Sequence, residues 1–273
     1  MEFERLSSTA TIEKPKIITA EGKPARDVHI AIRDLEMSYD GLLIQRNLTF
    51  DIYRGEVFVI MGASGCGKST LLRHCIGLMR PTKGSILYED RDFWASSEKE
   101  RINMMQKFGI LYQSGALWSA MTLSENIITI LERYTDLTKS EMKDIAHLKL
   151  SLVGLSGFEE FYPSDISGGM RKRAGLARAM ALDPAILFFD EPSAGLDPIS
   201  SRKLDDLILE LKESLGTTIV IVTHELASIF AIGDNSVFLD TLTKTMIGYG
   251  NPKELLKNPP RPVIREFLTR GEK

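Results

Sequence analysis

The chain has 273 residues, with 34 Lys or Arg against 37 Asp or Glu, which gives a formal charge of −3. This length suits one large α/β domain or two small ones. The weakly acidic balance argues against a general nucleic-acid-binding protein, and no apolar run is long enough to span a bilayer. We expect no secretory signal, and the only two cysteines, Cys66 and Cys75, exclude a disulfide framework and favour a reducing cytosol.

The first part of the chain predicts an antiparallel β layer. Residues 1–27 are polar and lack periodicity, so we expect a flexible lead-in. Val28 to Leu35 then alternates between apolar and polar residues, which predicts a half-exposed antiparallel strand. A turn signal follows at Asp40-Gly41, and Asn47 to Tyr53 alternates again.

The stretch Gly62-Ala63-Ser64-Gly65-Cys66-Gly67-Lys68-Ser69 has the spacing GxxxxGKS of a phosphate-binding loop. It follows the wholly apolar Val57 to Met61, typical of a buried parallel strand, and precedes a helical pattern over Thr70 to Met79. The glycines let backbone N–H groups converge, and a helix N-terminus attracts an anion. Lys68 adds a charge toward the β- and γ-phosphates, and the Ser69 hydroxyl can bind Mg²⁺.

An alternative interpretation of the octet is a glycine-rich turn with a chance lysine, which its position between a strand and a helix disfavours. Cys66 lies inside the loop, where it is either a small filler or a residue close to the nucleotide. We therefore expect a maleimide at Cys66 to block ATP hydrolysis by its bulk, and bound ATP to protect the thiol.

The remaining pattern alternates helices with apolar strands, which is typical of an α/β fold. The expected elements are strand 85–88, helix 98–107, strand 108–112, helices 123–134, 139–153 and 170–182, strand 185–189, helix 200–214, strands 217–222, 236–239 and 244–249, and a polar tail over 251–273 with a helix-like segment at 263–268.

Polar residues follow several of the apolar strands: Gln113, the pair Asp190-Glu191, and His224. Ligands bind at the carboxyl ends of strands in open α/β sheets, so we expect these residues to share one site with the phosphate-binding loop. Asp190 is placed to hold Mg²⁺. Pro192 favours an extended backbone at Glu191, which would turn its carboxylate toward the γ-phosphate and the attacking water. A helix cap or a solvated turn is the alternative for the acidic pair.

Ser167-Gly168-Gly169 opens a helix whose first turn is basic, with Arg171, Lys172 and Arg173. Cations there oppose the helix dipole, so this turn is a candidate anion site. Because the chain already has one phosphate-binding loop, a second anion site suggests that it serves the nucleotide of another copy. A solvated helix start with a serine N-cap fits the residues equally well.

With these motifs in order, the chain resembles the ATP-binding subunit of an ATP-binding cassette (ABC) transporter from about Val28 to Gly250. The matching motifs are Walker A (62–69), the Q-loop (Gln113), the signature (166–170), Walker B (ending at 189–191), the D-loop (193–197) and the switch histidine (His224). The resemblance implies a P-loop (RecA-like) ABC nucleotide-binding domain over residues 28–250. It has an antiparallel β subdomain and a helical signature subdomain at about 114–183.

The resemblance also implies an ATPase in which two copies pack head to tail around two ATP molecules with Mg²⁺. Tyr39 matches the aromatic residue that stacks on adenine; packing on the β layer is its alternative. The implied nucleotide contacts are Tyr39, Gly62, Ser64, Gly65, Cys66, Gly67, Lys68, Ser69, Thr70 and Gln113, with Ser167, Gly168 and Gly169 from the second copy. The implied metal-site residues are Ser69, Gln113 and Asp190, and the implied catalytic residues are Glu191, His224 and Lys68.

Departures from the common pattern narrow the subfamily. Ile166 and Met170 replace the end residues of LSGGQ, and the Q-loop continues as Ser114 to Trp118. This combination resembles the ATPases of Mla-type systems, which act with MCE proteins and move phospholipid between bacterial membranes. The implied partners are a second copy, a permease and an MCE-domain protein, without nucleic acid, on the cytoplasmic side of the inner membrane. Another importer or exporter substrate is the alternative; a soluble translation or DNA-repair ATPase is disfavoured because it would carry a second cassette or long insertions.

The loop Ala116 to Met121 is apolar although it reads as a loop, and it contains Trp118. Tryptophan is a frequent anchor at protein interfaces. We expect this loop to form the groove that receives a permease helix. The alternative is that Trp118 packs inside the helical subdomain.

Overall fold

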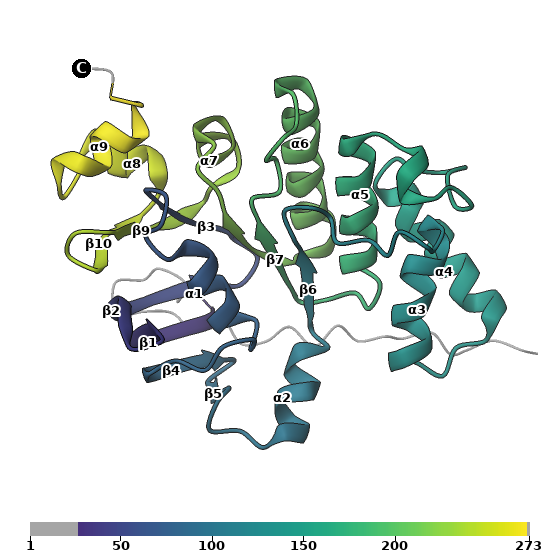
Figure 1. Ribbon diagram of the computed structural model, residues 1–273, viewed down its shortest axis with the longest axis horizontal. Helices are drawn as coiled ribbons and strands as arrows, with labels where there is room; N and C mark the ends of the chain where they lie inside the picture. Colours follow the sequence, from purple (N-terminus) through teal and green to yellow (C-terminus); the bar gives the residue numbers. More distant parts are fainter. Residues whose placement is uncertain (1–26, 272–273) are drawn as a thin grey trace, which may run out of the picture.

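The computed structural model describes residues 27–271, so residues 1–26 of the expected lead-in lie outside the described part of the chain. Figure 1 shows the order of the elements along the chain. The strands are β1 (Val28–Tyr39), β2 (Leu42–Tyr53), β3 (Val57–Gly62), β4 (Lys83–Tyr88), β5 (Arg91–Asp92), β6 (Phe108–Leu111), β7 (Ile186–Asp190), β8 (Thr218–Val222), β9 (Asn235–Asp240) and β10 (Thr245–Gly250). The helices are α1 (Lys68–Cys75), α2 (Glu98–Met105), α3 (Leu123–Tyr134), α4 (Lys139–Leu152), α5 (Gly168–Ala179), α6 (Pro198–Leu215), α7 (Leu226–Ile232), α8 (Pro252–Lys257) and α9 (Pro262–Leu268), with a 3-10 turn at Pro163–Asp165.

The larger sheet has the order β10-β9-β3-β8-β7-β6, and every neighbouring pair except β10–β9 is parallel. Strands β3 and β8 lie at its centre and are buried throughout, as the unbroken apolar runs predicted. The carboxyl ends of β3, β6, β7 and β8 therefore meet at one edge of the sheet. A mainly parallel sheet whose strands are linked by helices confirms the expected α/β fold.

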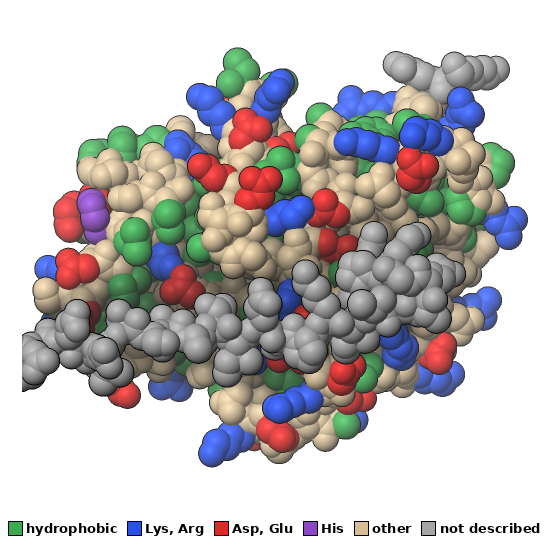
Figure 2. All heavy atoms as spheres, turned by 180° about the vertical axis from the view of Figure 1, so that it is seen from behind, with side chains coloured by type: hydrophobic (Ala, Val, Ile, Leu, Met, Phe, Trp, Pro, Cys, Tyr) green, Lys and Arg blue, Asp and Glu red, His purple; other side chains and the backbone are tan. Residues whose placement is uncertain are grey.

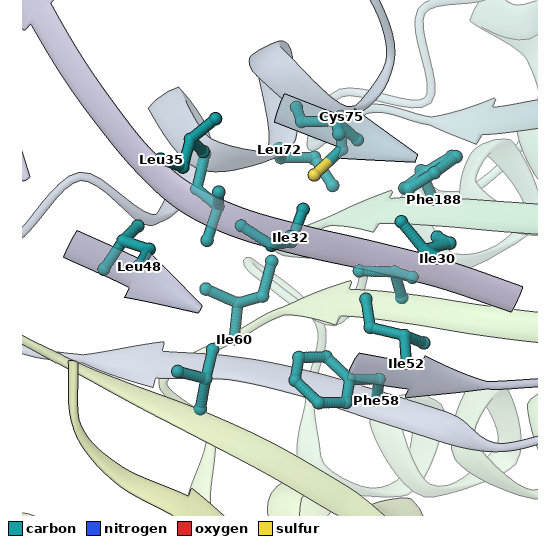
Figure 3. Packing of buried hydrophobic residues seen from close by; sticks show 14 of the residues in the cluster. Ile30, Ile32, Leu35, Leu48, Ile52, Phe58, Ile60, Leu72, Cys75 and Phe188 are labelled. Carbon is teal, nitrogen blue, oxygen red and sulfur yellow. The ribbon is translucent and has the colours of Figure 1, made fainter. Parts of the chain in front are cut away.

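The smaller sheet is antiparallel, with the order β2-β1-β4-β5. Figure 3 shows Ile32 and Leu35 of β1 facing Leu72 and Cys75 of α1, with Ile60 of the larger sheet below them. Side chains that alternate along β3 divide between the two faces of the sheet, as the two-residue period of a strand requires. One apolar cluster thus joins the two sheets and α1.

The expectation of a half-exposed first strand is wrong for its first part. His29, Ile30, Ala31 and Ile32 are all buried, so the face of His29 and Ala31 that was expected to be exposed is covered as well. The strand lies between β2 and β4, and the His29 ring contacts the start of β8 through Thr218. A polar residue in an alternating strand is expected to be exposed, but the hydrogen bond to Thr218 allows His29 to be buried.

The helical subdomain contains α3, α4 and α5, which Figure 1 places beyond β6 at the edge of the larger sheet. Two of these helices begin at capping boxes, Thr122 with Glu125 and Thr138 with Glu141, in which side chain and backbone exchange hydrogen bonds. Each box satisfies two otherwise unpaired N–H groups. For this reason the predicted starts at residues 123 and 139 agree with the structure.

The segment expected to be a polar tail is folded where the structure describes it. Helices α8 and α9 place Leu255, Ile264 and Leu268 in a buried cluster with Val59 and Met61 of β3. Helix α9 agrees with the helix-like segment expected at 263–268, whereas the sequence analysis missed α8 and α7, which are too short to show a helical period. Both segments depend on packing against the sheet, because helices this short are marginal alone.

None of the described helices is both long and apolar enough to cross a membrane. On the face seen from behind, Lys and Arg side chains are interspersed with Asp and Glu side chains over the visible described residues (Figure 2). A nucleic-acid-binding surface would gather the basic side chains instead.

Candidate nucleotide site

The phosphate-binding loop has the glycine geometry that the sequence predicted. Gly62, Gly65 and Gly67 all have positive φ angles, of 142°, 77° and 98°. A Cβ on Gly62 would lie 2.3 Å from the Leu239 carbonyl oxygen, and one on Gly67 would lie 2.6 Å from a methyl carbon of Ile44. Side chains at these two positions would therefore collide with the walls of the loop.

Gln45 is a supporting residue that the sequence analysis missed. Its side chain is fully buried, and Nε2 donates to the carbonyls of Cys66, at 2.7 Å, and Asp240, at 3.0 Å. These bonds tie the middle of the loop to the end of β9. Within the sequence Gln45 is one polar residue in an alternating strand, so no pattern distinguishes it.

Lys68 begins α1, and Gly67 precedes it in the left-handed region without a side-chain cap. The Lys68 ammonium donates to the carbonyls of Gly62, at 2.9 Å, and Ala63, at 3.2 Å, so it folds back over the loop. An uncapped helix start leaves N–H groups for an anion. The cation and these N–H groups together fit a polyphosphate.

Ser69 and Asp190 meet across the gap between α1 and β7, with 2.9 Å between the serine Oγ and the aspartate Oδ1. Mg²⁺ prefers hard oxygen donors such as hydroxyl and carboxylate oxygens. The donor set therefore fits the magnesium site that the sequence predicted. Gln113 lies after β6, and its exposed side chain is not among the residues that line the cleft.

The pair Glu191 and His224 joins the ends of β7 and β8. His224 Nδ1 lies 2.9 Å from Glu191 Oε1, while Oε2 is buried without a partner among the described residues. The extended backbone expected at Glu191 is wrong, because its φ is +49°. Its N–H still pairs with Val222, but its carbonyl accepts from Ala194, so the chain reverses at this residue. Positive φ is strained for a residue with a Cβ.

Lys68, Ser69 and Glu191 line a cleft of about 590 Å³ between the antiparallel sheet and α1, whereas Asp190 and His224 are not among its lining residues. Its lining residues are Tyr39, Leu42, Ile44, Ser64, Gly65, Gly67, Lys68, Ser69, Thr70, Arg73, Met79 and Glu191. The Tyr39 side chain does not pack inside the β layer, since the residue is 61% exposed at the end of β1. An exposed aromatic face beside a phosphate-binding loop is suited to stacking on a base.

The signature residues lie outside this cleft. Ser167 and Gly169 line a separate hollow of about 450 Å³ with Leu196 and Ser200, and the two hollows share no lining residue. Ser167 is also the N-cap of α5, since its Oγ accepts from Met170 N at 3.3 Å. The serine therefore caps the helix, and the hollow at the start of α5 is separate from the cleft at the chain's own phosphate-binding loop.

The basic side chains in the first turn of α5 contact carbonyls of their own chain. Arg171 donates to Ile166 O, Arg173 donates to Val153 O, and Lys172 donates to Gln113 O. All three cations are thus directed to backbone carbonyls of their own chain, which offsets their unfavourable position in the helix dipole. Burial lowers the pKa of the Lys172 ammonium, and the Glu191 carboxylate opposes that shift.

Cys66 is not available in the way that the maleimide expectation required. Its side chain is 2% exposed and packs with the apolar cluster under the loop. Burial raises the pKa of the thiol, and Lys68 partly opposes this. The thiolate is the reactive form, so we now expect slow labelling of the folded protein.

Trp118 lies at the surface and is 45% exposed, which disfavours packing inside the helical subdomain. The guanidinium of Arg178 lies 5.4 Å from the centre of its ring. The fully buried Asn126, which the sequence analysis missed, holds the loop: it accepts from Trp118 N at 2.8 Å and donates to three carbonyls. These hydrogen bonds hold the loop in one conformation, and the loop exposes the Trp118 ring at the surface.

Comparisons with known proteins agree with this geometry. Residues 45–194 match the ABC transporter family. A probable ribonucleotide transport ATP-binding protein, mkl, of Mycobacterium leprae is 42% identical over 92% of this chain and 72% of its own length. The intermembrane phospholipid transport system ATP-binding protein MlaF of Escherichia coli K12 is 36% identical over 88% of each chain.

A solved structure shows the same fold. It is the dimeric post-hydrolysis state of the ATP-binding cassette MJ0796 bound to ADP and Pi, with a TM-score of 0.73. It is 26% identical in sequence and covers 81% of this chain and 98% of that one. The family match extends over more than half of the chain, and the phosphate-binding loop, Asp190 and Glu191 lie together at the sheet edge. The chain therefore belongs to the ABC transporter family and is a nucleotide-binding ATPase that works with ATP and Mg²⁺.

Proposed function

We propose that this ATPase drives the transport of phospholipid or another lipid between bacterial membranes, as a head-to-tail dimer bound to a membrane permease. The observation that carries the dimer is the separation of the two hollows, since the signature residues do not line the cleft of their own chain. A second copy would bring Ser167, Gly168 and Gly169 to that cleft and complete the site. The 36% identity to MlaF supports the lipid cargo.

Each group at the cleft has a role in phosphoryl transfer. Lys68 and the loop N–H groups bind the phosphates, and the partner's signature N–H groups face the γ-phosphate from the other side. Glu191 orients water, because its buried Oε2 has no described partner while Oε1 is held by His224. Ser69 and Asp190, with Gln113, would hold Mg²⁺, and the bound ion would supply positive charge to offset that of the phosphates.

A groove of about 490 Å³ is suited to the permease. Exposed apolar side chains line it from α2, α3 and the loop after β6: Ile102, Met105, Trp118 and Tyr134. An aromatic anchor in an apolar groove is typical of helix recognition. The groove is lined in part by β6 and Tyr112, and Gln113 is the next residue of the chain. A helix bound in the groove would therefore lie next to the segment that carries Gln113.

The groove is tested with Trp118→Ala. We expect ATP binding by the purified chain to be unchanged, because Trp118 is not among the residues that line the nucleotide cleft. Co-purification with the permease and stimulation of ATP hydrolysis by the permease should both be reduced. Normal co-purification together with normal stimulation would contradict this role of the groove.

One alternative to a lipid cargo is supported by a specific observation. The relative from Mycobacterium leprae is named for ribonucleotide transport, which favours a nucleotide cargo as the second candidate. Purification of the complex from its native membrane decides between them, with mass spectrometry of the bound small molecules and protein partners. We expect phospholipid, a permease and an MCE-domain protein on the cytoplasmic side of the inner membrane. Bound nucleotide at the cargo site, without lipid, would overturn the lipid proposal.

A further inference from the structure

Lys172 is a buried cation that the site described above does not use. It lies on the first turn of α5, and the residue is only 6% exposed. Its ammonium donates to the carbonyl oxygen of Gln113, and it lies 3.4 Å from the carbonyl oxygen of Glu191. One side chain of the signature helix therefore contacts the backbone of both loops that follow β6 and β7.

We propose that Lys172 is a positioning residue that ties the start of α5 to Gln113 and Glu191, so that the position of the signature helix sets the geometry of the chain's own catalytic edge. This inference rests on the proposed roles of Gln113 and Glu191. It adds a link between them that their own side chains do not provide.

The energetics of the contact support this assignment. A buried ammonium costs several kcal/mol unless hydrogen-bond acceptors satisfy it, so Lys172 requires these carbonyls to stay in place. The dependence is mutual at Glu191, whose left-handed backbone is strained. A cation beside the Glu191 carbonyl stabilises the reversal that holds the carboxylate against His224.

The packing of α5 makes the link rigid. A Cβ on Gly175 would lie 2.8 Å from the carbonyl oxygen of Gly115, and a Cβ on Gly115 would lie 3.1 Å from the carbonyl oxygen of Arg171. Helix α5 and the loop after Gln113 therefore touch backbone to backbone. Because close-packed surfaces move as units, a shift at Gly168 is transmitted one turn along α5 to Lys172.

Three variants of the full chain test the proposal. Lys172→Met removes the ammonium but keeps most of the volume, and Lys172→Arg restores a cation. Lys149→Met is the matched control, since Lys149 is also buried in the helical subdomain but pairs with Asp183, away from the cleft. Each variant is measured for thermal unfolding, for the affinity of a fluorescent ATP analogue, and for kcat and KM of ATP hydrolysis.

We expect Lys172→Met to lower kcat about 10-fold while KM and analogue affinity change less than about 2-fold, because positioning acts on the chemical step. Lys172→Arg should recover at least half of the lost kcat, and Lys149→Met should lose thermal stability but keep its kcat. A kcat of Lys172→Met within about 2-fold of the parent, or an equal loss in Lys149→Met, would overturn the proposal.

Should Lys172→Met fail to fold, Gly175→Ala decides the question. It keeps the lysine but forces α5 away from Gly115, and we expect a reduced kcat with unchanged analogue affinity. An unchanged kcat would then overturn the proposal. The parent chain separates this result from the proposed function: ATP hydrolysis by the parent supports the ATPase whatever the Lys172 variants do.

Discussion

At the amino ends of β3 and β8, the polar groups around the buried His29 and Thr218 side chains are paired with one another. His29 Nδ1 lies 2.7 Å from Thr218 Oγ1, its Nε2 lies 3.1 Å from Arg54 Nη1, and Arg54 also pairs with Glu89. At the carboxyl ends of the same sheet, one Glu191 oxygen and the Ser193 hydroxyl are buried with no partner among the described residues. Unpaired buried polar atoms cost stability, so the carboxyl edge is left ready for a ligand, whereas the polar groups at the amino edge satisfy one another.

The backbone is strained at both edges, because Glu191 has a φ of +49° at the carboxyl edge and Glu89 has a φ of +50° in the network around His29. The buried atoms without a partner, and not backbone strain, therefore distinguish the carboxyl edge. Substitutions at the carboxyl edge should change catalysis more than folding, and substitutions at the amino edge should do the reverse.

The largest effect should come from Glu191→Gln. We expect kcat for ATP hydrolysis to fall about 100-fold or more, because an amide cannot take a proton from the attacking water. ATP should still bind and drive dimer formation, measured by size-exclusion chromatography. Thermal stability should be unchanged or higher, since the substitution removes a partly buried negative charge. Retained turnover would exclude Glu191 as the base.

Lys68→Ala should weaken nucleotide binding itself. The ammonium is the one cation that the sequence places inside the loop octet, and charge-assisted contacts to phosphate are strong. We expect the dissociation constant of a fluorescent ATP analogue to rise about 10- to 100-fold. Unchanged affinity would show that the loop N–H groups alone bind the phosphates.

His29→Ala should reverse this pattern at the amino edge. Loss of a buried, hydrogen-bonded side chain should lower the free energy of unfolding by about 2 to 4 kcal/mol, measured in urea. The kcat of the folded fraction should remain close to that of the parent. A large loss of kcat at full folding would break the comparison between the two edges.

The stability effect of His29→Ala should also depend on pH, because the pKa of His29 is shifted in the folded chain. Burial, with help from the nearby Arg54 guanidinium, lowers the pKa of His29 from 6.5 to about 4. The unfolded chain therefore binds more protons between these values, and the contribution of His29 to stability is lost as the pH falls from 6.5 toward 4. The stability gap between the parent and His29→Ala should narrow over this window.

The smallest effect should come from Lys107→Ala, the exposed control in the same network. Lys107 Nζ lies 3.5 Å from Glu89 Oε2, and its side chain is 58% exposed. Exposed ion pairs contribute little, so we expect a change in unfolding free energy below about 0.5 kcal/mol. A loss as large as that of His29→Ala would mean that surface charge, and not buried pairing, stabilises this edge.

The sequence by itself determined the nucleotide loop, the polar residues that follow the apolar strands, and the long helices. These features depend on local chemistry: glycines with positive φ, unbroken apolar runs, and capping boxes at Thr122 and Thr138. Local signals of this kind do not need the rest of the fold. The sequence also placed the phosphate-binding loop and Asp190 in one site, because parallel strands end at one edge, and in the structure Ser69 contacts Asp190.

The tertiary structure alone decided the reversed backbone of Glu191, the burial of Cys66 and the directions of the basic side chains on α5. Each depends on residues far away in the sequence: Val222 pairs with Glu191, and Gln113 accepts from Lys172 across 59 positions. No local pattern records such a partner. A polar or charged residue reads as exposed until its distant acceptor is known, because burial is permitted only where hydrogen bonds compensate it.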